Sequence, residues 1–313
     1  MNSTPSVILI RNAASYDFGG GERFPIFLAV ELAKNGFEPT IISRHQTLRE
    51  LARDCGVATI RGWWWSRQNW SGWRNLLLPL YVCWQLVLFF YYLVQFVRLK
   101  PAAVHIQSKD DFIAASYAAR VVGATVVWTD HADLKHIFKN VRTWYKNPIG
   151  KLVYLAARAA DAITVVSKSE KSAVCTHLGA GSKLNDKITV IYNGCADVLS
   201  HYPSHATSPS TTFVIASRLV TDKGISEAIE AFIDLHNEYS DTTLCIAGDG
   251  PEKEKFTRQA SLHKSITFIG HQKDPYAVMK RGDVFVQPTY HEGFSVVLVE
   301  ACMLEMPIIT TSV

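Results

Sequence analysis

Residues 283–301, DVFVQPTYHEGFSVVLVEA, contain one complete strand, turn and helix of the predicted fold. The β-branched run DVFVQPT predicts a strand that ends near Thr289, and the apolar run that begins at Val296 predicts a helix. Residues 291–295 form the turn between them, at the carboxyl end of the strand. Open α/β sheets bind ligands at this end of their strands. The stretch therefore predicts both an α/β fold and the position of a ligand site.

The same alternation of strand and helix continues along the chain, which predicts parallel sheets flanked by helices. The predicted strands are SVILIRN (6–12), EPTIIS (38–43), PAAVHIQ (101–107), ATVVWT (124–129), AITVVS (162–167), KITVIYN (187–193), TTFVIAS (211–217), TTLCIAG (242–248), SITFIG (265–270), DVFVQPT (283–289) and PIITT (307–311). A chain of 313 residues usually folds as two domains. The Ser-, Pro-, His- and Thr-rich segment 195–211 predicts a linker near residue 200. We therefore expect two Rossmann-like α/β domains, 1–200 and 201–313, that face each other across a cleft.

Composition excludes several functional classes. The net charge of +4, from 32 Lys and Arg against 28 Asp and Glu, is mild and looks evenly spread, so no nucleic acid partner is expected. The six cysteines occur singly, without Cys-x-x-Cys pairs, and indicate neither a zinc site nor a disulfide framework. The N-terminus has no basic start or long apolar region typical of a secretory signal. A cytoplasmic location is expected.

Segment 61–98 departs from this rhythm. It begins with tryptophans and arginines, namely Trp63, Trp64, Trp65, Trp70, Trp73, Arg61, Arg67 and Arg74. The apolar run 76–97 is long enough to cross a bilayer. However, strand 101–107 must rejoin the sheet of strand 38–43, so we expect a crossover helix. The helix could be a buried or partly covered core helix, a membrane-surface helix with Trp and Arg at the headgroups, or a transmembrane helix. Contacts to a sugar or an acceptor could also explain the five tryptophans. We favour membrane-surface contact.

The turn after strand 283–289 contains several candidate ligand-binding residues. Ser295 is placed to cap the following helix, so that the backbone amides from Gly293 through Phe294 face a ligand. Glu292 could accept hydrogen bonds from a hydroxyl-rich ligand. Glu300 lies roughly 7–8 Å further along the helix, at about 1.5 Å per residue, among apolar neighbours that predict a buried helix. Because a buried carboxylate needs donors, its partner should be either ribose hydroxyls or a structural ion pair.

Two cations follow the first strand of the second domain. Arg218 and Lys223 bracket the turn in SRLVTDKG, where they could hold a diphosphate or lie on a solvated surface. No two aspartates in the chain are separated by one residue, so the metal-binding Asp-x-Asp pattern is missing. The charge of a departing diphosphate would then be met by Arg218, Lys223 and helix-terminal amides. We expect no metal and no cofactor besides the donor substrate.

Further candidates lie at other strand ends. In the first domain, Gly19, Gly20 and Gly21 of DFGGGERF would allow close approach of a ligand, although a plain tight turn is the alternative, and Phe24 breaks the dinucleotide fingerprint. The motif TDHAD places His131 between two aspartates, Asp130 and Asp133, at a strand end. In the second domain the glycines of IAGDGPE and ITFIGH suit either a nucleotide or a turn. They are Gly248, Gly250 and Gly270.

Together these motifs resemble the retaining glycosyltransferases of family four, which have the GT-B fold. The ordered motifs are GGGER, TDHAD, VVSKSEK, VIYNGCAD, SRLVTDKG, IAGDGPE, ITFIGH and EGFSVVLVEA. The resemblance implies a UDP- or GDP-type sugar donor bound mainly by the second domain, and a glycan or lipid-linked acceptor bound mainly by the first. By position, Glu292 would contact the donor sugar, Glu300 the ribose, and Arg218 with Lys223 the diphosphate. His131 would lie beside the sugar, and Gly20 near the phosphates or the acceptor.

The resemblance also implies attachment to the cytoplasmic membrane face through the first domain, and a role in polysaccharide assembly. The sequence departs from the family pattern at two positions: Glu305 stands where members often have Gly, and Gln107 where they often have a second His. Family members also continue beyond the position of Val313, so we expect an incomplete second domain in a fragment or a natural truncation. The alternatives are a non-catalytic membrane-associated remnant, or a phosphorylase or nucleotide-sugar epimerase of the same fold.

Overall fold

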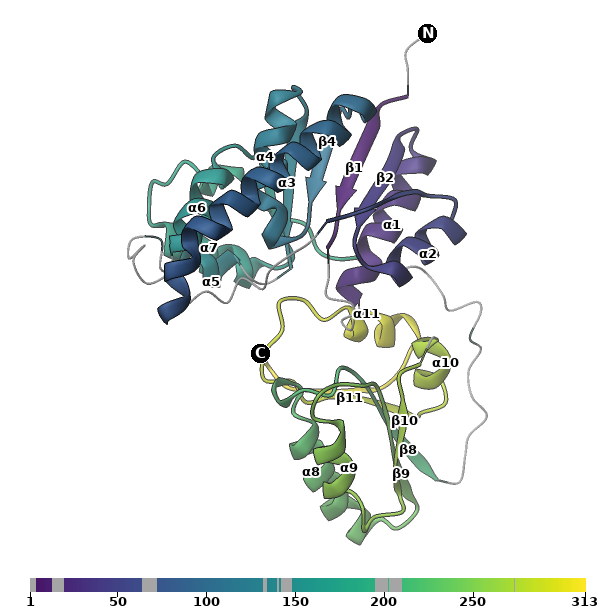
Figure 1. Ribbon diagram of the computed structural model, residues 1–313. Helices are drawn as coiled ribbons and strands as arrows, with labels where there is room; N and C mark the ends of the chain where they lie inside the picture. Colours follow the sequence, from purple (N-terminus) through teal and green to yellow (C-terminus); the bar gives the residue numbers. More distant parts are fainter. Residues whose placement is uncertain are drawn as a thin grey trace. The chain divides into compact units, whose positions relative to one another are not determined.

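The computed structural model of the chain describes residues 4–12, 20–63, 72–131, 134–139, 141, 148–194, 202, 210–272 and 274–313, with only the backbone of 20–22 and 72–74. The chain divides into two compact units, Met1–Asn193 and Gly194–Val313 (Figure 1). We call them unit 1 and unit 2. The linker predicted near residue 200 lies almost wholly outside the described residues.

Unit 1 contains a seven-stranded parallel sheet with the order β3-β2-β1-β4-β5-β6-β7. Its strands are β1 (Ser6–Ile10), β2 (Glu38–Ser43), β3 (Ala58–Arg61), β4 (Ala103–Ile106), β5 (Thr125–Asp130), β6 (Ala162–Val165) and β7 (Ile188–Val190). Its α-helices are α1 (Gly20–Lys34), α2 (Gln46–Asp54), α3 (Leu78–Leu99), α4 (Phe112–Val121), α5 (Leu134–Phe138), α6 (Pro148–Ala157) and α7 (Lys168–Leu178). The strand order reverses between β1 and β4, as expected of a doubly wound fold.

Apolar side chains on both faces of the central strands explain this layered structure, because successive side chains of a strand point to opposite faces. On one face, Ile8 and Trp128 pack in a large cluster with residues of α3, α4 and α6. On the other face, Val7 and Leu9 pack with residues of α1 and α2. A strand buried on both sides reads as a continuous apolar run, which is why these strands are visible in the sequence.

Helix α3 is a crossover helix that leads into β4, as predicted, but it starts after β3 rather than directly after β2. It lies beside α4 (Figure 1) and buries Tyr81, Gln85, Leu88, Tyr92 and Phe96. By length and composition alone, Asn75–Leu99 is also long and apolar enough to cross a membrane, yet less than a quarter of its most apolar window is buried. Of the other α3 side chains, several apolar ones are exposed and the rest are mostly half-buried. The residues 64–71 of the tryptophan-rich segment lie outside the described residues.

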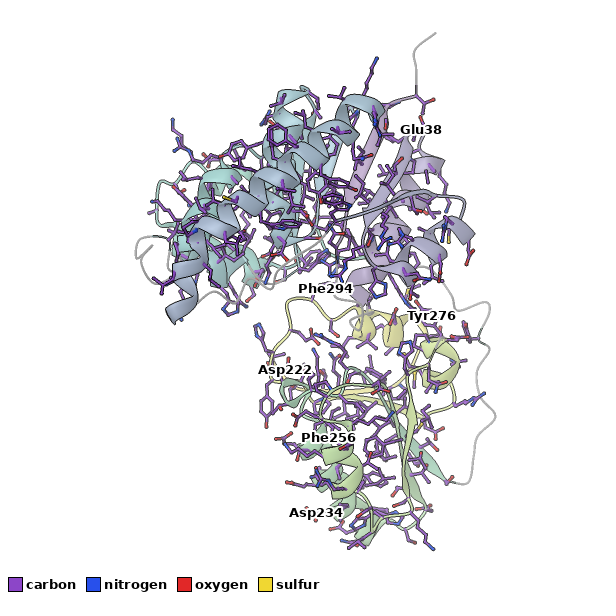
Figure 2. All side chains as sticks on the ribbon, viewed as in Figure 1. Glu38, Asp222, Asp234, Phe256, Tyr276 and Phe294 are labelled. Carbon is purple, nitrogen blue, oxygen red and sulfur yellow. The ribbon has the colours of Figure 1, made fainter. Side chains whose placement is uncertain are left out.

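Unit 2 contains a five-stranded parallel sheet with the order β10-β9-β8-β11-β12. Its strands are β8 (Thr211–Ala216), β9 (Thr242–Ala247), β10 (Ile266–Gly270), β11 (Val284–Gln287) and β12 (Ile308–Thr310), and its helices are α8 (Ile225–Glu238), α9 (Lys253–Gln259), α10 (Pro275–Met279) and α11 (Val296–Met303). One core cluster packs α8 and α9, with Phe256, against the sheet, and a second packs α10 and α11 (Figure 2).

The eleven strands predicted from the sequence are all present, and β3 was missed. Strand β3 has only four residues, lies at the edge of the sheet, and has no buried side chain. It therefore lacks the continuous apolar run that marks the other strands. The expected even spread of charge was also wrong. Unit 1 has 23 Lys and Arg against 13 Asp and Glu, a net charge of +10, and unit 2 has 9 against 15, a net charge of −6.

Candidate functional site

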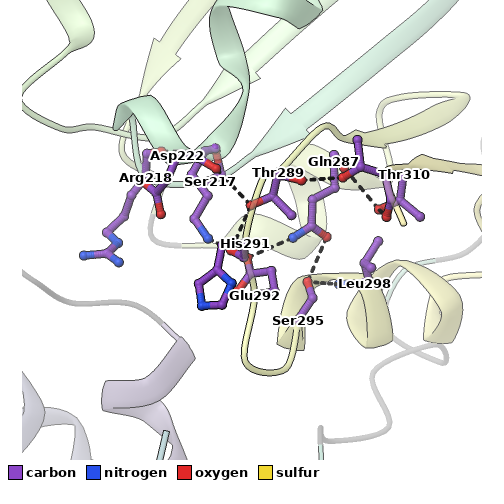
Figure 3. Close-up of polar contacts among 12 residues, drawn as sticks. Ser217, Arg218, Asp222, Gln287, Thr289, His291, Glu292, Ser295, Leu298 and Thr310 are labelled. Atoms are coloured by element: carbon purple, nitrogen blue, oxygen red, sulfur yellow. Dashed lines mark hydrogen bonds and ion pairs between the residues drawn. The ribbon is translucent and has the colours of Figure 1, made fainter. Parts of the chain in front are cut away.

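The turn between β11 and α11 is held by a chain of polar contacts (Figure 3). Ser295 caps α11 by accepting a hydrogen bond from the Leu298 amide at 3.3 Å, as predicted. The Ser295 hydroxyl donates to Gln287 Oε1 at 2.8 Å, and Gln287 Nε2 donates to Glu292 Oε1 at 3.1 Å. The last residue of β11 therefore fixes both the helix cap and the carboxylate of the turn.

Lys223 completes this cluster from another part of the chain. Its ammonium lies 2.5 Å from Glu292 Oε1, and the two side chains are only 13% and 24% exposed. The contact follows from close packing of the turn after β8 on the end of β11. A Cβ atom on Gly224, whose φ is +65°, would stand 1.9 Å from the carbonyl oxygen of Pro288. Only glycine fits there, so Gly224 sets the position of its neighbour Lys223.

Arg218 belongs to the same loop but not to the same cluster. It is exposed, and its side chain extends away from Glu292 (Figure 3). The structure thus brings together two of the predicted residues, Lys223 and Glu292, and leaves Arg218 on the surface beside them. The assignment of these residues to a diphosphate and a sugar stays a prediction.

Glu300 is buried, as predicted, and has a partner inside the protein. The hydroxyl of Tyr276 on α10 donates to Glu300 Oε1 at 2.9 Å (Figure 2 shows Tyr276 in unit 2). The helix around it is less buried than expected: within α11 only Glu300 and Ala301 are buried. The expectation of a fully buried α11 was wrong, because the apolar residues on the other sides of this helix remain half exposed.

The predicted glycines have different roles. A Cβ on Gly248 would stand 1.8 Å from the Ser217 carbonyl oxygen, and one on Gly250 would stand 2.4 Å from that of Leu219. Close packing of two loops therefore requires glycine at both positions, whatever ligand is bound. Gly270 ends β10 with a φ of +71°. Gly293 and Phe294 lie in the turn before α11, and Gly20 begins α1.

In unit 1, His131 directly follows β5. Burial and the nearby Arg11 and His105 hold the pKa of its imidazole well below the usual value, so the ring is neutral at pH 7. Its ring lies edge-on to Phe24 of α1, with the centroids 5.1 Å apart. The preceding Asp130 accepts a hydrogen bond from the Leu134 amide and so holds the start of α5. Asp133 lies outside the described residues.

Three polar residues near these sites were missed by the sequence analysis as site residues: Gln287, Tyr276 and Gln107. The two glutamines each stand at the end of an apolar strand, and that isolated polar residue was the available signal. Tyr276 gave no signal, because its contact with Glu300 depends on tertiary packing. Within the described part of the chain, no group of three or more His, Cys, Asp or Glu side chains could hold a metal ion.

Comparison with known proteins identifies the family. Residues 18–197 match the family model described as Glycosyltransferase Family 4, and residues 203–313 match the model described as Glycosyl transferases group 1. The chain is 28% identical over 182 residues to glycogen synthase of Mycobacterium tuberculosis (54% of this chain, 43% of that protein). It is 26% identical over 231 residues to a subunit of human phosphatidylinositol N-acetylglucosaminyltransferase (70% and 45%). The chain thus spans less than half the length of these relatives.

Solved structures show the same fold. One is Anabaena Alr3699/HepE in complex with UDP and glucose, with a TM-score of 0.70 and 18% identity, covering 98% of this chain and 80% of that one. Another is a glycosyltransferase from Rickettsia africae, with a TM-score of 0.73 and 17% identity, covering 99% and 80%. With its two parallel α/β units and its matches to both models, the chain belongs to glycosyltransferase family 4 and has the GT-B fold.

Proposed function

We propose that this protein is a retaining hexosyltransferase that moves a sugar from a nucleotide diphosphate to a glycan or lipid-linked acceptor in cell-surface polysaccharide synthesis. The observation that carries the proposal is the contact between Lys223 and Glu292 at the carboxyl end of the unit 2 sheet. Relatives support the process: the chain is 35% identical over 107 residues to the capsular polysaccharide glycosyltransferase CapM of Staphylococcus aureus (32% of this chain, 28% of that protein).

The cluster suggests how a donor would bind. Lys223 is neutralised by Glu292, and a diphosphate, which carries more negative charge, would compete for the ammonium. That exchange would leave Glu292 to accept hydrogen bonds from the donor sugar, while Gln287 keeps it in place. Arg218, exposed on the same loop, would provide the second cation for the departing diphosphate. No protein nucleophile is assigned. The acceptor hydroxyl would attack the sugar's anomeric carbon on the same face from which the diphosphate departs and pass its proton to the departing diphosphate, which accounts for retention.

Two further residues have proposed contacts with the substrate. Glu300 would accept hydrogen bonds from the ribose hydroxyls, and the hydrogen bond from Tyr276 holds one of its oxygens in a fixed direction. In unit 1, the imidazole of His131 would contact the transferred sugar. Because burial keeps this ring neutral, it would act as a hydrogen-bonding group rather than as a cation.

The test is calorimetric titration of the purified protein with UDP, GDP and ADP, followed by transfer assays with sugars on the base that binds. Binding should weaken about tenfold or more in Arg218→Ala and Lys223→Ala, because each removes a charge-assisted contact. A matched control is Lys253→Ala, since Lys253 pairs with Asp249 on the exposed surface. Failure of all three nucleotides to bind the folded protein would favour a non-catalytic remnant. Turnover that needs free phosphate, or no acceptor, would favour a phosphorylase or an epimerase.

We also propose that unit 1 attaches to the cytoplasmic face of the membrane. The outer face of α3 supports this location, because it carries apolar side chains that are 46–60% exposed: Leu80, Leu86, Phe90, Val94 and Val97. Beside it, an apolar groove of about 340 Å³ runs between α3, α4 and α6. The net charge of +10 on unit 1 is attractive to anionic lipids. Apolar insertion and charge attraction together give stable surface binding.

Membrane attachment can be tested by sedimentation with vesicles. Vesicles with anionic phosphatidylglycerol should bind the protein more tightly than neutral phosphatidylcholine vesicles, and added salt should weaken the binding. Phe90→Glu places a charge in the exposed face of α3 and should lower binding about tenfold. Tyr239→Glu, at a comparably exposed aromatic residue of unit 2, should not. Equal binding by both variants would refute the role of α3.

A further inference from the structure

Two buried glutamines of unit 1 have opposite environments. Gln85, on α3, is 7% exposed, and both of its polar atoms are bonded: Nε2 donates to the Asp110 carbonyl oxygen at 3.0 Å and Oε1 accepts from the Ala114 amide at 3.2 Å. Gln107 is 3% exposed, and neither its Nε2 nor its Oε1 has a partner among the described residues. A buried amide without partners costs free energy, so a ligand that supplies hydrogen-bond partners to Gln107 would bind favourably there.

The backbone of Gln107 is fixed, which leaves the side chain little room to relax. Its amide donates to the Ile10 carbonyl oxygen at 2.9 Å, which extends the ladder between β1 and β4 by one residue. Its carbonyl oxygen accepts a hydrogen bond from Arg11 Nη1 at 2.7 Å. The residue therefore stands at the carboxyl ends of β1 and β4, where the strand order of the sheet reverses. Ligands of doubly wound sheets bind at this point.

A further buried polar atom without a partner among the described residues lies at the same edge. His131 Nε2 is buried without a hydrogen-bond partner in the described part of the chain. His131 directly follows β5, the neighbour of β4, and the register pairs His105 with Val127. Alternation along the strands then places His105, Gln107, Thr129 and His131 on one face of the sheet. The contact between His105 Nε2 and Thr129 Oγ1, at 2.5 Å, confirms that these two side chains share one face.

The chemistry of this pair is that of a hydroxyl-binding site. A carboxamide offers a donor and an acceptor in a fixed plane, and a neutral imidazole nitrogen offers one of the two. Neither group carries charge, so neutral hydroxyls satisfy both without leaving a buried ion. We propose that Gln107, together with His131, binds the ring hydroxyls of a sugar, and that Gln107 selects which hydroxyl configuration is accepted. The identity of this sugar as donor or acceptor rests on the proposed transferase function; the hydroxyl site itself does not.

The first test is stability, which needs no ligand. Gln107→Leu removes two unbonded polar atoms and keeps a side chain of similar size, so the urea midpoint of unfolding should stay unchanged or rise. Gln85→Leu is the matched control: it removes the hydrogen bonds to the Asp110 carbonyl and from the Ala114 amide, so its midpoint should fall. A Gln107→Leu protein that is as destabilised as Gln85→Leu, or that fails to fold while Gln85→Leu folds, would overturn the proposal.

The second test is sugar binding. Saturation-transfer NMR with the methyl α-glycosides of glucose, galactose and mannose, with and without UDP, should show transfer to at least one of them. Gln107→Leu should weaken that binding at least tenfold, and Gln85→Leu should not. If the ligand is the donor sugar, Gln107→Leu will instead weaken binding of UDP-glucose relative to UDP in calorimetry. Sugar and UDP-glucose binding that are both unaffected by Gln107→Leu would show that only solvent meets this side chain.

The two proposals fail in different ways. UDP binding to the unit 2 cluster, with no effect of Gln107→Leu on any sugar, would leave the transferase function standing and remove the hydroxyl site. Glycoside binding that depends on Gln107, with no binding of any nucleotide, would support the hydroxyl site and refute the transferase function.

Discussion

Gln287 and Gln107 occupy equivalent positions in the two units, and the structure treats them differently. Each stands at the carboxyl end of a parallel strand and is almost fully buried. Gln287 is bonded on both sides, to Glu292 and to Ser295. Gln107 is bonded on neither side within the described residues. The strand-end glutamine of unit 2 therefore has its hydrogen bonds within the protein, whereas that of unit 1 has none among the described residues.

This difference predicts two modes of ligand binding. In unit 2, an incoming ligand must displace an internal contact, that of Lys223 with Glu292, and gains only the difference between the old and the new partner. In unit 1, a ligand supplies partners to side-chain atoms that have none among the described residues, and it displaces no internal contact in doing so. Both units should become more stable when a ligand binds, but the polar cluster of unit 2 should hold its geometry without one.

The strongest way to break the comparison is to remove the internal contact of unit 2. Glu292→Gln should lower sugar transfer by about 10²–10³-fold, or roughly 3–4 kcal/mol, because a group aimed at the reacting sugar is lost. The free energy of unfolding should change by less than about 1 kcal/mol, since the ion pair is partly exposed. Steady-state kinetics and urea unfolding measure the two quantities. Full transfer activity in this variant would remove Glu292 from the site.

A control for this variant exists nearby. Glu227 accepts a hydrogen bond from the Tyr290 hydroxyl on the exposed surface, close in sequence to Lys223. Glu227→Gln removes the same charge from the same unit without touching the cluster. It should leave transfer within about twofold of the parent. Equal losses in both variants would mean that the net charge of unit 2, rather than Glu292 itself, determines activity.

The histidines of unit 1 provide the next largest effect, through pH. Burial lowers the pKa of His105 to about 4, so its folded form stays neutral when the unfolded chain takes up a proton near pH 6.5. The stability that this group contributes is present above pH 6.5 and is lost as the pH falls towards 4. The loss should reach about 3 kcal/mol, at 1.36 kcal/mol per pKa unit.

Comparison with a variant isolates this effect from other titrating groups. Among these, Asp111 acts in the opposite direction. Burial raises its pKa to about 6, so the folded state takes up a proton before the unfolded chain does, and a fall in pH stabilises the folded protein at this group. As the pH falls from 6.5 to 4, the parent should lose more unfolding free energy than the His105→Gln variant does. Urea unfolding at several pH values measures it. A difference that is constant with pH would show that His105 titrates alike in both states.

The third prediction sets the two strand-end glutamines against each other. Gln287→Leu leaves Glu292 and Ser295 without their shared partner, and should lower the free energy of unfolding by about 2 kcal/mol. Gln107→Leu, the matched change in unit 1, should cost nothing measurable. Urea unfolding of both variants gives the comparison. Similar losses at the two positions would show that the difference between the units has no energetic meaning.

The sequence predicted the sheets well because their strands are buried on both faces and form continuous apolar runs. It missed β3, whose four residues are half exposed at the sheet edge. It placed Lys223 and Glu292 at carboxyl ends of strands, yet could not show their contact, which joins positions 69 residues apart. That contact depends on Gly224 packing against Pro288, a tertiary fact that no local pattern contains.

The two glutamines mark the limit of sequence reasoning most clearly. QPTYHEGFS places the partners of Gln287 five and eight residues further along the same turn, so a local reading could have found them. QSKDDF after β4 also offers polar neighbours to Gln107. These neighbours bond to other residues instead: Asp111, for example, accepts hydrogen bonds from Tyr92 and Asn12. Whether a strand-end polar group is satisfied was decided by packing across strands, which the sequence does not show.

The smallest predicted effect concerns backbone strain in unit 2, at the end of α11. Helix α11 ends in a left-handed turn in which Glu305 has a φ of +57°, Met306 donates to the Ala301 carbonyl, and Glu305 donates to that of Cys302. This is a Schellman cap, in which glycine is favoured by about 1 kcal/mol over residues with a Cβ. Glu305→Gly should therefore raise the free energy of unfolding by about 1 kcal/mol and leave nucleotide binding unchanged.

Lys100 supplies the matched position in unit 1, since it follows α3 with a φ of +45°, and these are the two non-glycine residues with positive φ in the described part of the chain. Lys100→Gly should stabilise unit 1 by a similar amount. If Glu305→Gly instead weakens nucleotide binding, the strained cap helps to set the position of α11 and belongs to the site. Both units would then carry an unfavourable free energy that serves ligand binding. In unit 2 it would be backbone strain at the end of the helix that carries Glu300, and in unit 1 it would be the unbonded side chain of Gln107.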